Sequence, residues 1–335
     1  MKFSKILSSL MAMNGLVQAH PGEDHTAELA LRHEYFKRNA GNLAHCAPKL
    51  RSTGVTARSV SRRSATVQGL RKKRGLTTKR GEYQVDSGYT IDTDPTVLFS
   101  SNSSCALAPE EVVGPYYVEG ERIRSDLVED QQGIPLALDI QFVDSSTCSP
   151  IEGAYIDIWS CNSTGVYGGV VARRNGDGTG DPSNLYNSWL RGVQKTDDDG
   201  VVQFSTLFPG HYEGRTIHIH TMAHLNARRL SNGTLFDTVA AYVGQIYFDQ
   251  DLNNRTNNYW PYTSNTQSVT LNDDDGILQA DLKAGGNPYA EYSLLGDSLE
   301  DGILAWITFG INVTNSETVT PVATYHPALS TGFGN

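Results

Sequence analysis

Residues 136–143 read LALDIQFV, a run in which large apolar residues occupy every second position. Side chains of a strand point alternately to its two faces, so this run predicts a β-strand with one face in an apolar core. The turn pairs Asp199-Gly200 and Asp275-Gly276 directly precede two further predicted strands, residues 201–207 and 277–282. The further β candidates are residues 154–160, 201–207, 215–222, 240–248, 277–282 and 303–313. Strands separated by turns, without long amphipathic helices between them, predict a mainly β chain folded as an antiparallel β-sandwich.

The charge of the chain is divided between two regions. The 335 residues include 27 Lys and Arg against 37 Asp and Glu, a formal net charge of −10. Residues 20–80 hold 14 of the basic residues and only 4 acidic ones, so the remainder is strongly acidic. A general nucleic-acid binder needs excess positive charge to displace phosphate counterions. The acidic region, which contains the predicted strands, therefore excludes a nucleic-acid partner.

The basic segment, residues 20–80, has a helical pattern. Apolar and long side chains extend over residues 27–50 and 55–70, and basic runs follow at residues 71–74 and at Lys79-Arg80. Three interpretations stay open: a propeptide cut after a dibasic site, a basic arm for acidic polymers or membrane surfaces, and a helical segment docked on the acidic domain. Cys46 favours retention, because removal of the segment would discard a disulfide partner. Residues 81–104 are rich in Asp, Ser, Thr and Asn and predict a linker.

The N-terminus has the features of a secretory signal. Lys2 and Lys5 precede an apolar stretch over residues 6–17, and small residues stand where a signal peptidase would cut after Ala19. The stretch is shorter than the roughly 20 residues that a bilayer span needs, so we expect no membrane span. Residues 1–19 are therefore predicted to be a signal peptide of a secreted protein. Five sequons agree with a secretory route: Asn102, Asn162, Asn232, Asn254 and Asn312.

Secretion affects how the four cysteines, Cys46, Cys105, Cys148 and Cys161, are interpreted. An oxidising compartment favours disulfides, and four cysteines allow three connectivities among which the sequence does not choose. A bond between Cys148 and Cys161 is the least favoured, because an extended strand separates them. No spacing of Cys and His indicates zinc.

The most informative segment is Gly210-His-Tyr-Glu-Gly-Arg-Thr-Ile-His-Ile-His-Thr221. In a strand, residues i and i+2 project from the same face, so His218 and His220 direct two imidazoles at one point. This is an arrangement of metal ligands. Two partly exposed histidines on a polar sheet face are the plainer interpretation of that pair taken alone.

The surrounding sequence resembles the intradiol catechol dioxygenases, a family of non-haem ferric enzymes that includes catechol and protocatechuate dioxygenases. The similarity covers about residues 105–312, and no one matching piece is specific without the others. Four pieces match in order: Glu111-Val-Val-Gly-Pro-Tyr-Tyr117, Trp159-x-x-Asn-x-x-Gly-x-Tyr167, Pro209-Gly-x-Tyr-x-Gly-Arg215 leading to His218-x-His220, and Gly244-Gln-Ile-Tyr-Phe248.

The resemblance implies one non-haem Fe(III) per chain, bound by Tyr167, Tyr212, His218 and His220. Two phenolates are hard ligands that favour Fe(III), whereas ferrous oxygenases use two His and one carboxylate. A bound cation can hold a phenol deprotonated although its ordinary pKa is near 10. Each tyrosine could instead be a core residue with a hydrogen-bonded hydroxyl.

The resemblance also implies how a small aromatic diol and O2 would react. Catechol would bind the iron through both oxygens and displace Tyr212, which accepts a substrate proton. Cleavage between the two oxygenated carbons would give a muconate-type diacid. Arg215 and Gln245 match residues that stabilise developing negative charge, although a salt bridge within the acidic domain is the plainer role for Arg215.

Residues Gly114, Pro115 and Tyr116 are expected to bind the substrate side of the pocket, and the sequence does not separate Tyr116 from Tyr117. Strand parity places Arg215 on the face opposite His218 unless the strand begins after Arg215.

Taken together, the sequence predicts a secreted intradiol ring-cleavage dioxygenase, similar to secreted fungal members. Residues 105–313 form its β-sandwich domain and residues 314–335 a C-terminal tail. The N-terminal region does not match the helical dimerisation domain of the bacterial enzymes, so the oligomeric state cannot be carried over. A non-catalytic sandwich module that binds aromatics or carbohydrate is the alternative. Extradiol cleavage is disfavoured because no spaced carboxylate ligand accompanies the histidines.

Two local sequence features, the acidic runs and one sequon, allow further predictions. The acidic runs at residues 197–200 and 272–276 look superficially like calcium loops but lack the further spaced oxygen ligands, so they are expected to be hairpin turns. Asn162 lies inside a motif that matches the family, so burial is expected to keep this sequon unglycosylated.

Overall fold

The structure is a computed structural model that describes residues 42–76, 93–99, 104–106, 108–109, 114, 116–172, 175–176, 181–237, 241–314 and 321–325. The predicted signal peptide, residues 20–41, Lys79-Arg80, most of the predicted linker and the end of the chain lie outside these residues. Among the described residues, no helix combines the length and the apolar character that crossing a bilayer requires.

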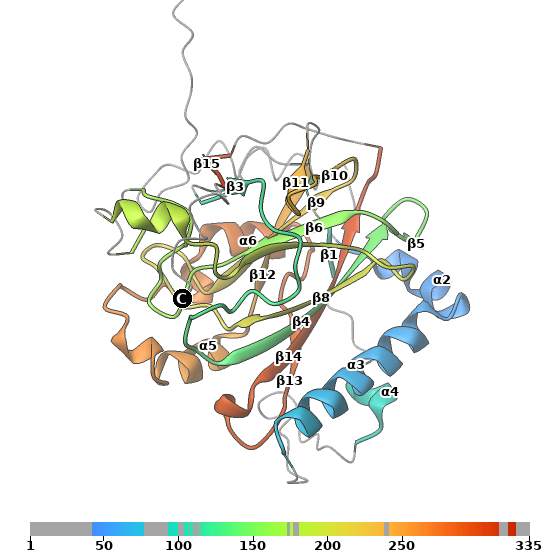
Figure 1. The fold of residues 1–335 in the computed structure, drawn as a ribbon. Coiled ribbons are helices and arrows are strands. Elements are labelled where there is room, and N and C mark those ends of the chain that lie inside the picture. Colours follow the sequence, from blue (N-terminus) through green and yellow to red (C-terminus); the bar gives the residue numbers. More distant parts are fainter. Residues whose placement is uncertain are drawn as a thin grey trace, which may run out of the picture.

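Strands dominate the described structure, as the sequence predicts (Figure 1). They are β1 (Ser104–Ala106), β2 (Ala108–Pro109), β3 (Val118–Glu119), β4 (Pro135–Asp144), β5 (Ser149–Pro150), β6 (Tyr155–Trp159), β7 (Arg191–Lys195), β8 (Val201–Leu207), β9 (His218–His224), β10 (Arg228–Arg229), β11 (Leu235–Phe236), β12 (Ala241–Tyr247), β13 (Glu291–Leu294), β14 (Ile303–Ile311) and β15 (Ala323–Thr324).

The helices are few and mostly short. The α-helices are α2 (Ala47–Ser52), α3 (Val55–Lys73), α4 (Pro95–Leu98), α5 (Gln250–Asn257) and α6 (Gly276–Lys283). Short 3₁₀ helices are η1 (Ala44–Cys46), η3 (Pro182–Tyr186), η4 (Tyr262–Ser264), η5 (Asn272–Asp274) and η6 (Leu299–Asp301). α4 lies in the predicted linker, where Phe99 packs edge-on against Trp306 with ring centroids 5.4 Å apart.

One sheet contains six strands and is mixed in direction, which corrects the expectation of a wholly antiparallel arrangement. β14 lies between β1 and β4 and runs parallel to both, whereas β8 and β13 pair antiparallel with their neighbours. Alternation along a strand specifies its buried face but not its direction. Parallel neighbours need a crossover connection, and here four of the five strands of the second sheet, β6, β7, β9 and β12, lie between β4 and β14 in the chain.

The second sheet contains His218, His220 and Gln245. Its order is β2-β12-β9-β6-β7, and every pair in it is antiparallel. In the pairing of β9 with β12, His220 stands opposite Gln245 and His218 opposite Tyr247. Two β9 histidines and two β12 side chains thus share one region of the sheet.

Both sheets bury apolar residues in a common cluster. From the first sheet it takes Leu138 and Ile307, and from the second sheet Ile158 and Ile246, all of them at most 1% exposed. Alternate residues of β14 point away from this cluster, and among them Trp306 packs with Val60 of α3. The nine residues of β14 are therefore buried on both faces of the sheet.

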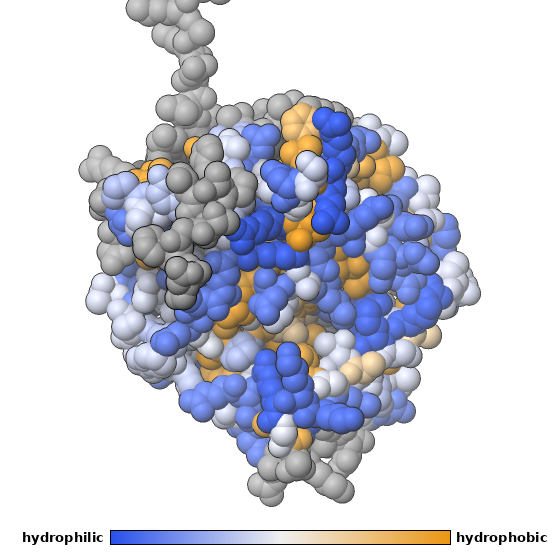
Figure 2. Space-filling view, viewed as in Figure 1, coloured by the Kyte–Doolittle hydropathy of each residue, from blue (hydrophilic) through white to orange (hydrophobic). Residues whose placement is uncertain are grey.

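The described part of the basic N-terminal segment lies against the β4–β14 sheet (Figure 1). Arg62 and Arg63 of α3 both contact the buried carboxylate of Asp139 on β4, with N–O distances of 2.7 and 3.3 Å. Arg58 pairs with Asp199 at 2.6 Å nearer the surface. Figure 2 shows that the outer surface over α3 is mostly hydrophilic. Basic residues of this segment thus pair with the acidic domain.

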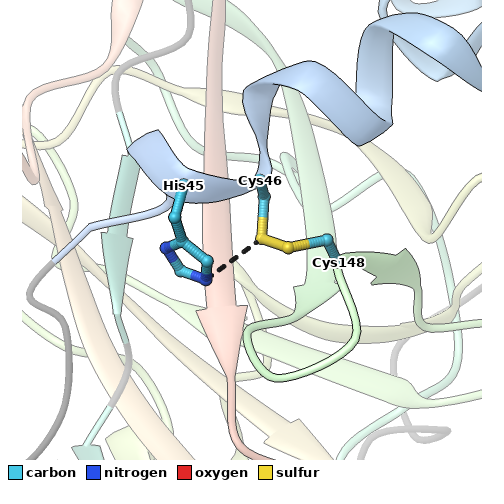
Figure 3. A group of neighbouring side chains, drawn as sticks. All are labelled: His45, Cys46 and Cys148. Carbon is cyan, nitrogen blue, oxygen red and sulfur yellow. Dashed lines mark hydrogen bonds between the residues drawn. A yellow bond between two sulfur atoms is a disulfide. The ribbon is translucent and has the colours of Figure 1, made fainter.

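A disulfide joins Cys46 of this segment to Cys148, the last residue of the turn between β4 and β5 (Figure 3). His45 accompanies it, with Nε2 3.3 Å from the Cys46 sulfur and 2.8 Å from the Ser145 carbonyl oxygen. The ligand atoms of the three side chains lie within 4.8 Å of one another. Because the two sulfurs are bonded to each other, the cluster is a disulfide with an adjacent imidazole. Cys161 is a buried free thiol.

One predicted strand is wrong. Residues 277–282 belong to α6, because the side chain of Asp275 accepts hydrogen bonds from the backbone N–H groups of Ile277 and Leu278 and caps the helix. The Asp275-Gly276 pair therefore starts a helix instead of a hairpin. The Asp199-Gly200 pair does form a turn, where Gly200 has a φ of 72° directly before β8.

Candidate metal centre

His218 and His220 stand two residues apart on β9 and turn their rings to the same face of the sheet. Their Nε2 atoms are 3.1 Å apart, and both side chains are at most 2% exposed. The predicted convergence of two imidazoles is therefore present.

Each ring is oriented by a different kind of contact. The Nδ1 atom of His218 donates to the carbonyl oxygen of Thr216 at 2.7 Å, which leaves the lone pair on Nε2. The His220 ring stacks on the Trp159 indole, with centroids 4.8 Å apart and planes inclined by 6°. Burial, and secondly the charge of Arg215, lower the pKa of His218 to about 3. Burial also lowers the pKa of His220 well below its ordinary value, so both rings are neutral near pH 7, the state that binds metal ions.

The two predicted tyrosine ligands lie beside the histidines. The hydroxyl of Tyr212 is 3.2 Å from Nε2 of His218, and the Tyr167 ring meets the Tyr212 ring edge-on at 5.7 Å. The Tyr167 ring also contacts the His220 ring at a centroid distance of 6.0 Å. The buried Tyr167 hydroxyl makes no hydrogen bond to the described residues. The structure therefore brings all four predicted ligands together.

Close backbone contacts fix the two tyrosine-bearing loops. Gly165, with a φ of 81°, lies so near the other loop that a Cβ there would be 2.2 Å from the carbonyl oxygen of His211. A Cβ on Gly210 would be 2.5 Å from the carbonyl oxygen of Asn162. The half-buried Asn162 side chain accepts hydrogen bonds at Oδ1 from Thr164 and from the amide of Val166, and its Nδ2, the atom that a glycan would modify, donates to Gln131 at 3.0 Å. Substitution of either glycine would separate the loops.

Arg215 precedes β9, so strand parity does not restrict it. Its Nη2 donates to Oε1 of Gln245 and, at 3.0 Å, to the hydroxyl of Tyr247. Its Nε donates to the carboxylate of Asp275 at 2.8 Å. Arg215 thus forms the salt bridge expected as its plainer role and also contacts Gln245.

The predicted substrate residues are placed in part. A Cβ on Gly114 would be 3.3 Å from Cε1 of His220, so this backbone passes close to the imidazole. Tyr116 stacks on Tyr167 with centroids 4.3 Å apart and meets Tyr212 edge-on, whereas Tyr117 packs on Trp159. The structure therefore separates the two tyrosines. Pro115 lies outside the described residues.

The buried Arg191 side chain connects the backbone at Tyr116 to the backbone that follows Tyr167. Arg191 donates to the carbonyl oxygens of Tyr116 and Gly168, both at 2.6 Å, and pairs with Glu121 at 3.1 Å. Burial raises the pKa of Glu121 to about 7, although Arg191 opposes this effect. Burial and the nearby Glu121 also raise the pKa of Asp157. Arg191 thus holds the backbone beside Tyr116 and Tyr167.

Sequence reasoning missed several residues that support the site. Asp275 binds Arg215, Tyr247 lies between Arg215 and Gln245, and Thr216 orients His218 through its carbonyl oxygen. The hydroxyl of Thr216 in turn donates to the side chain of Asn272 at 2.6 Å. The apolar residues Ile277, Leu278 and Leu282 after Asp275 follow a helical period, which is the signal that identifies Asp275 as a cap.

The donor set fits a hard cation. Burial raises the pKa values of Tyr167 and Tyr212 above their ordinary value, although the charge of Arg215 opposes this effect, so both phenols are neutral near pH 7 without a bound cation. A bound metal ion reverses this effect and stabilises phenolates. The unbonded hydroxyl of Tyr167 and the converging Nε2 atoms of His218 and His220 are what such an ion would coordinate.

The chain is similar in sequence to known dioxygenases. A family model described as Dioxygenase matches residues 112–258. An intradiol ring-cleavage dioxygenase from Tetranychus urticae is 30% identical; the match covers 65% of this chain and 99% of that one, with a TM-score of 0.49. Catechol 1,2-dioxygenase 1 from Acinetobacter lwoffii is 33% identical over 109 residues, 31% of this chain and 32% of that protein. The match thus spans about a third of that curated relative.

A structure of catechol 1,2-dioxygenase from Acinetobacter sp. ADP1 is 18% identical, over 70% of this chain and 72% of that one, with a TM-score of 0.39. From the family match and the identity to the mite protein over nearly its whole length, the chain belongs to the intradiol ring-cleavage dioxygenases.

Proposed function

We propose that this protein is a secreted non-haem Fe(III) dioxygenase that cleaves catechol-type diols with O2 between the two hydroxylated carbons. The products are muconate-type diacids, which contain both atoms of O2. The observation that supports this proposal is the convergence of two neutral imidazoles and two buried phenols. Tyr167, Tyr212, His218 and His220 would hold the iron, which when bound activates the diol as a Lewis acid.

The side chains of the chain itself would orient the diol and move its protons. Tyr212, beside His218, would be a phenolate when the cation is bound, and in that form it would accept a proton from a substrate hydroxyl. Arg215 and Gln245 stabilise negative charge that develops on the ring, since the guanidinium is fixed before the reaction begins. Gly114, Pro115 and Tyr116 bind the substrate side of the pocket.

Secretion and the retention of the basic segment form part of the same proposal. A signal peptide over residues 1–19 would export the chain to an oxidising compartment, where the Cys46–Cys148 disulfide is stable. The ion pairs of Arg62 and Arg63 with Asp139 favour a segment that stays docked on the domain over a discarded propeptide.

Oxygen uptake with catechol tests the activity directly. The iron-loaded protein should consume one O2 per catechol and release a muconate-type diacid, whereas extradiol cleavage would release a yellow semialdehyde. Tyr212→Phe should lose most of the activity, and Tyr186→Phe, whose ring is 42% exposed, should keep it. Absence of oxygen uptake by the iron-loaded wild type would point to a non-catalytic module that binds aromatics or carbohydrate.

A further inference from the structure

Asp275 is a completely buried carboxylate with four hydrogen-bond donors around it. One oxygen, Oδ2, accepts from Nε of Arg215 at 2.8 Å and from the backbone N–H of Thr216 at 2.9 Å. The other oxygen, Oδ1, accepts from the backbone N–H groups of Ile277 and Leu278, both at 3.0 Å. A single side chain therefore joins the start of α6 to the segment that leads into β9.

The contact with Arg215 is directional. The guanidinium is bound through Nε to Asp275, while Nη2 donates to Gln245 and Tyr247 on β12. The planar guanidinium presents its donors in a fixed fork, so an anchor on one edge determines where the other edge points. Asp275 binds the Nε edge of the guanidinium, and the β12 side chains bind its Nη2 group.

The contact with Thr216 extends the same control to a predicted ligand. The N–H of Thr216 binds Asp275, and its carbonyl oxygen accepts the hydrogen bond from Nδ1 of His218. Asp275 thus shares with Asn272, which accepts from the Thr216 hydroxyl at 2.6 Å, the task of holding the segment that orients His218, whereas Asp275 alone of the two binds Arg215.

We propose that Asp275 is a positioning residue that sets the guanidinium of Arg215 toward Gln245 and the substrate pocket. This inference rests on the proposed ring-cleavage activity, because Arg215 acts there on the substrate. Asp275 itself does not touch the substrate in this account and acts through Arg215.

A purely structural role as a helix cap is the competing explanation, and the substitution Asp275→Asn separates the two. Asparagine is as good a helix cap as aspartate. Its amide has only one oxygen, however, so in either orientation an N–H₂ group faces one pair of donors. If the cap is kept, the amide N–H₂ group faces Nε of Arg215 and the N–H of Thr216. It releases the guanidinium, whereas Thr216 stays held by the hydrogen bond from its hydroxyl to Asn272. Asp249→Asn is the matched control, since Asp249 caps α5 through the N–H of Leu252 at 2.8 Å.

The expected result is a loss of turnover without loss of iron. Asp275→Asn should lower kcat for catechol on the order of 10²-fold, the effect of misplacing a catalytic group by about 1 Å. KM, the iron content and the visible absorption of the iron-loaded protein should stay close to the wild type. Asp249→Asn should leave all four quantities unchanged. In an Arg215→Gln background, Asp275→Asn should lower kcat little further, because the residue it positions is absent.

Three results would overturn the inference. The first is an unchanged kcat in folded Asp275→Asn, and the second is an equal loss of kcat in Asp249→Asn. The third is a full additional loss in the Arg215→Gln background. If Asp275→Asn does not fold, Asp275→Ser replaces it, since serine also caps helices and lacks the second oxygen. A wild-type protein that binds iron but never cleaves catechol refutes the proposed function itself, a result distinct from these three.

Discussion

Replacement of Asp139 by Asn tests whether the basic segment is an integral part of the folded domain. The carboxylate is fully buried on β4 and accepts hydrogen bonds from Arg62 at 2.7 and 3.1 Å, from Arg63 at 3.3 Å and from Gln203 at 2.9 Å. Burial alone would raise the pKa of Asp139, but the two arginines hold it below its ordinary value. The side chain is therefore ionised and serves as the counter-ion for both arginines.

The expected loss of unfolding free energy follows from the burial of Arg63. The Arg63 side chain is 0% exposed, so Asp139→Asn removes a bound carboxylate from a buried guanidinium. Removal of one partner of a buried ion pair costs about 3–5 kcal/mol. We expect the free energy of unfolding to fall by about that amount.

Urea denaturation of the full chain, followed by circular dichroism, measures the difference. Asp199→Asn is the matched control, because its partner Arg58 is 52% exposed and water replaces the lost contact. This control should have nearly the wild-type midpoint. Equal midpoints for the two variants would refute the assignment of α3 to the folded domain.

Three further predictions use other contacts. Replacing both Cys46 and Cys148 by Ser should lower the free energy of unfolding by roughly 4 kcal/mol, because the bond closes a loop of 102 residues; an unchanged urea midpoint would contradict the disulfide. The raised pKa of Glu121 means that the folded state holds a proton between about pH 4.5 and pH 7, so stability falls as the pH rises through this window. Glu121→Gln should flatten the slope of stability against pH, and an unaltered slope would refute this. Gly165→Ala should lower the iron bound per chain by a larger fraction than it lowers the melting temperature, because the added Cβ would push the Tyr167 loop away from the carbonyl oxygen of His211. An iron content equal to that of the wild type would contradict the loop contact.

Local alternation was sufficient to identify several strands. Residues 136–143, 201–207 and 240–248 coincide closely with β4, β8 and β12, because each presents apolar side chains at every second position to one core. The mainly β character of the chain could thus be predicted. The parallel direction of β14 could not, because direction depends on chain connections far from the strand.

Elements that depend on a cap were harder to predict. The pair Asp275-Gly276 satisfies a turn pattern, yet the same aspartate begins α6 because its side chain binds two backbone N–H groups. The start of β9 at His218, three residues later than expected, has a similar origin. There the segment before the strand is held by Asp275 and Asn272, which are distant in sequence.

The candidate site likewise contains residues that the sequence predicts and contacts that only the folded chain shows. The spacing of His218 and His220 alone predicts that their rings converge, and the family motifs indicate Tyr167 and Tyr212. The contacts between Arg215 and Asp275 and between Arg191 and Glu121 join residues 60 and 70 positions apart. No local pattern encodes such pairs, so only the folded chain reveals them.

A visible absorption spectrum of the iron-loaded protein tests the central claim, that Tyr167, Tyr212, His218 and His220 bind Fe(III). Charge transfer from tyrosinate to Fe(III) should colour the wild type, and catechol added without O2 should shift the band to longer wavelength. Tyr167→Phe and Tyr212→Phe should each weaken the band, while Tyr186→Phe should leave it intact. A colourless protein that contains stoichiometric iron, or a full band in the Tyr167→Phe/Tyr212→Phe double variant, would contradict the account.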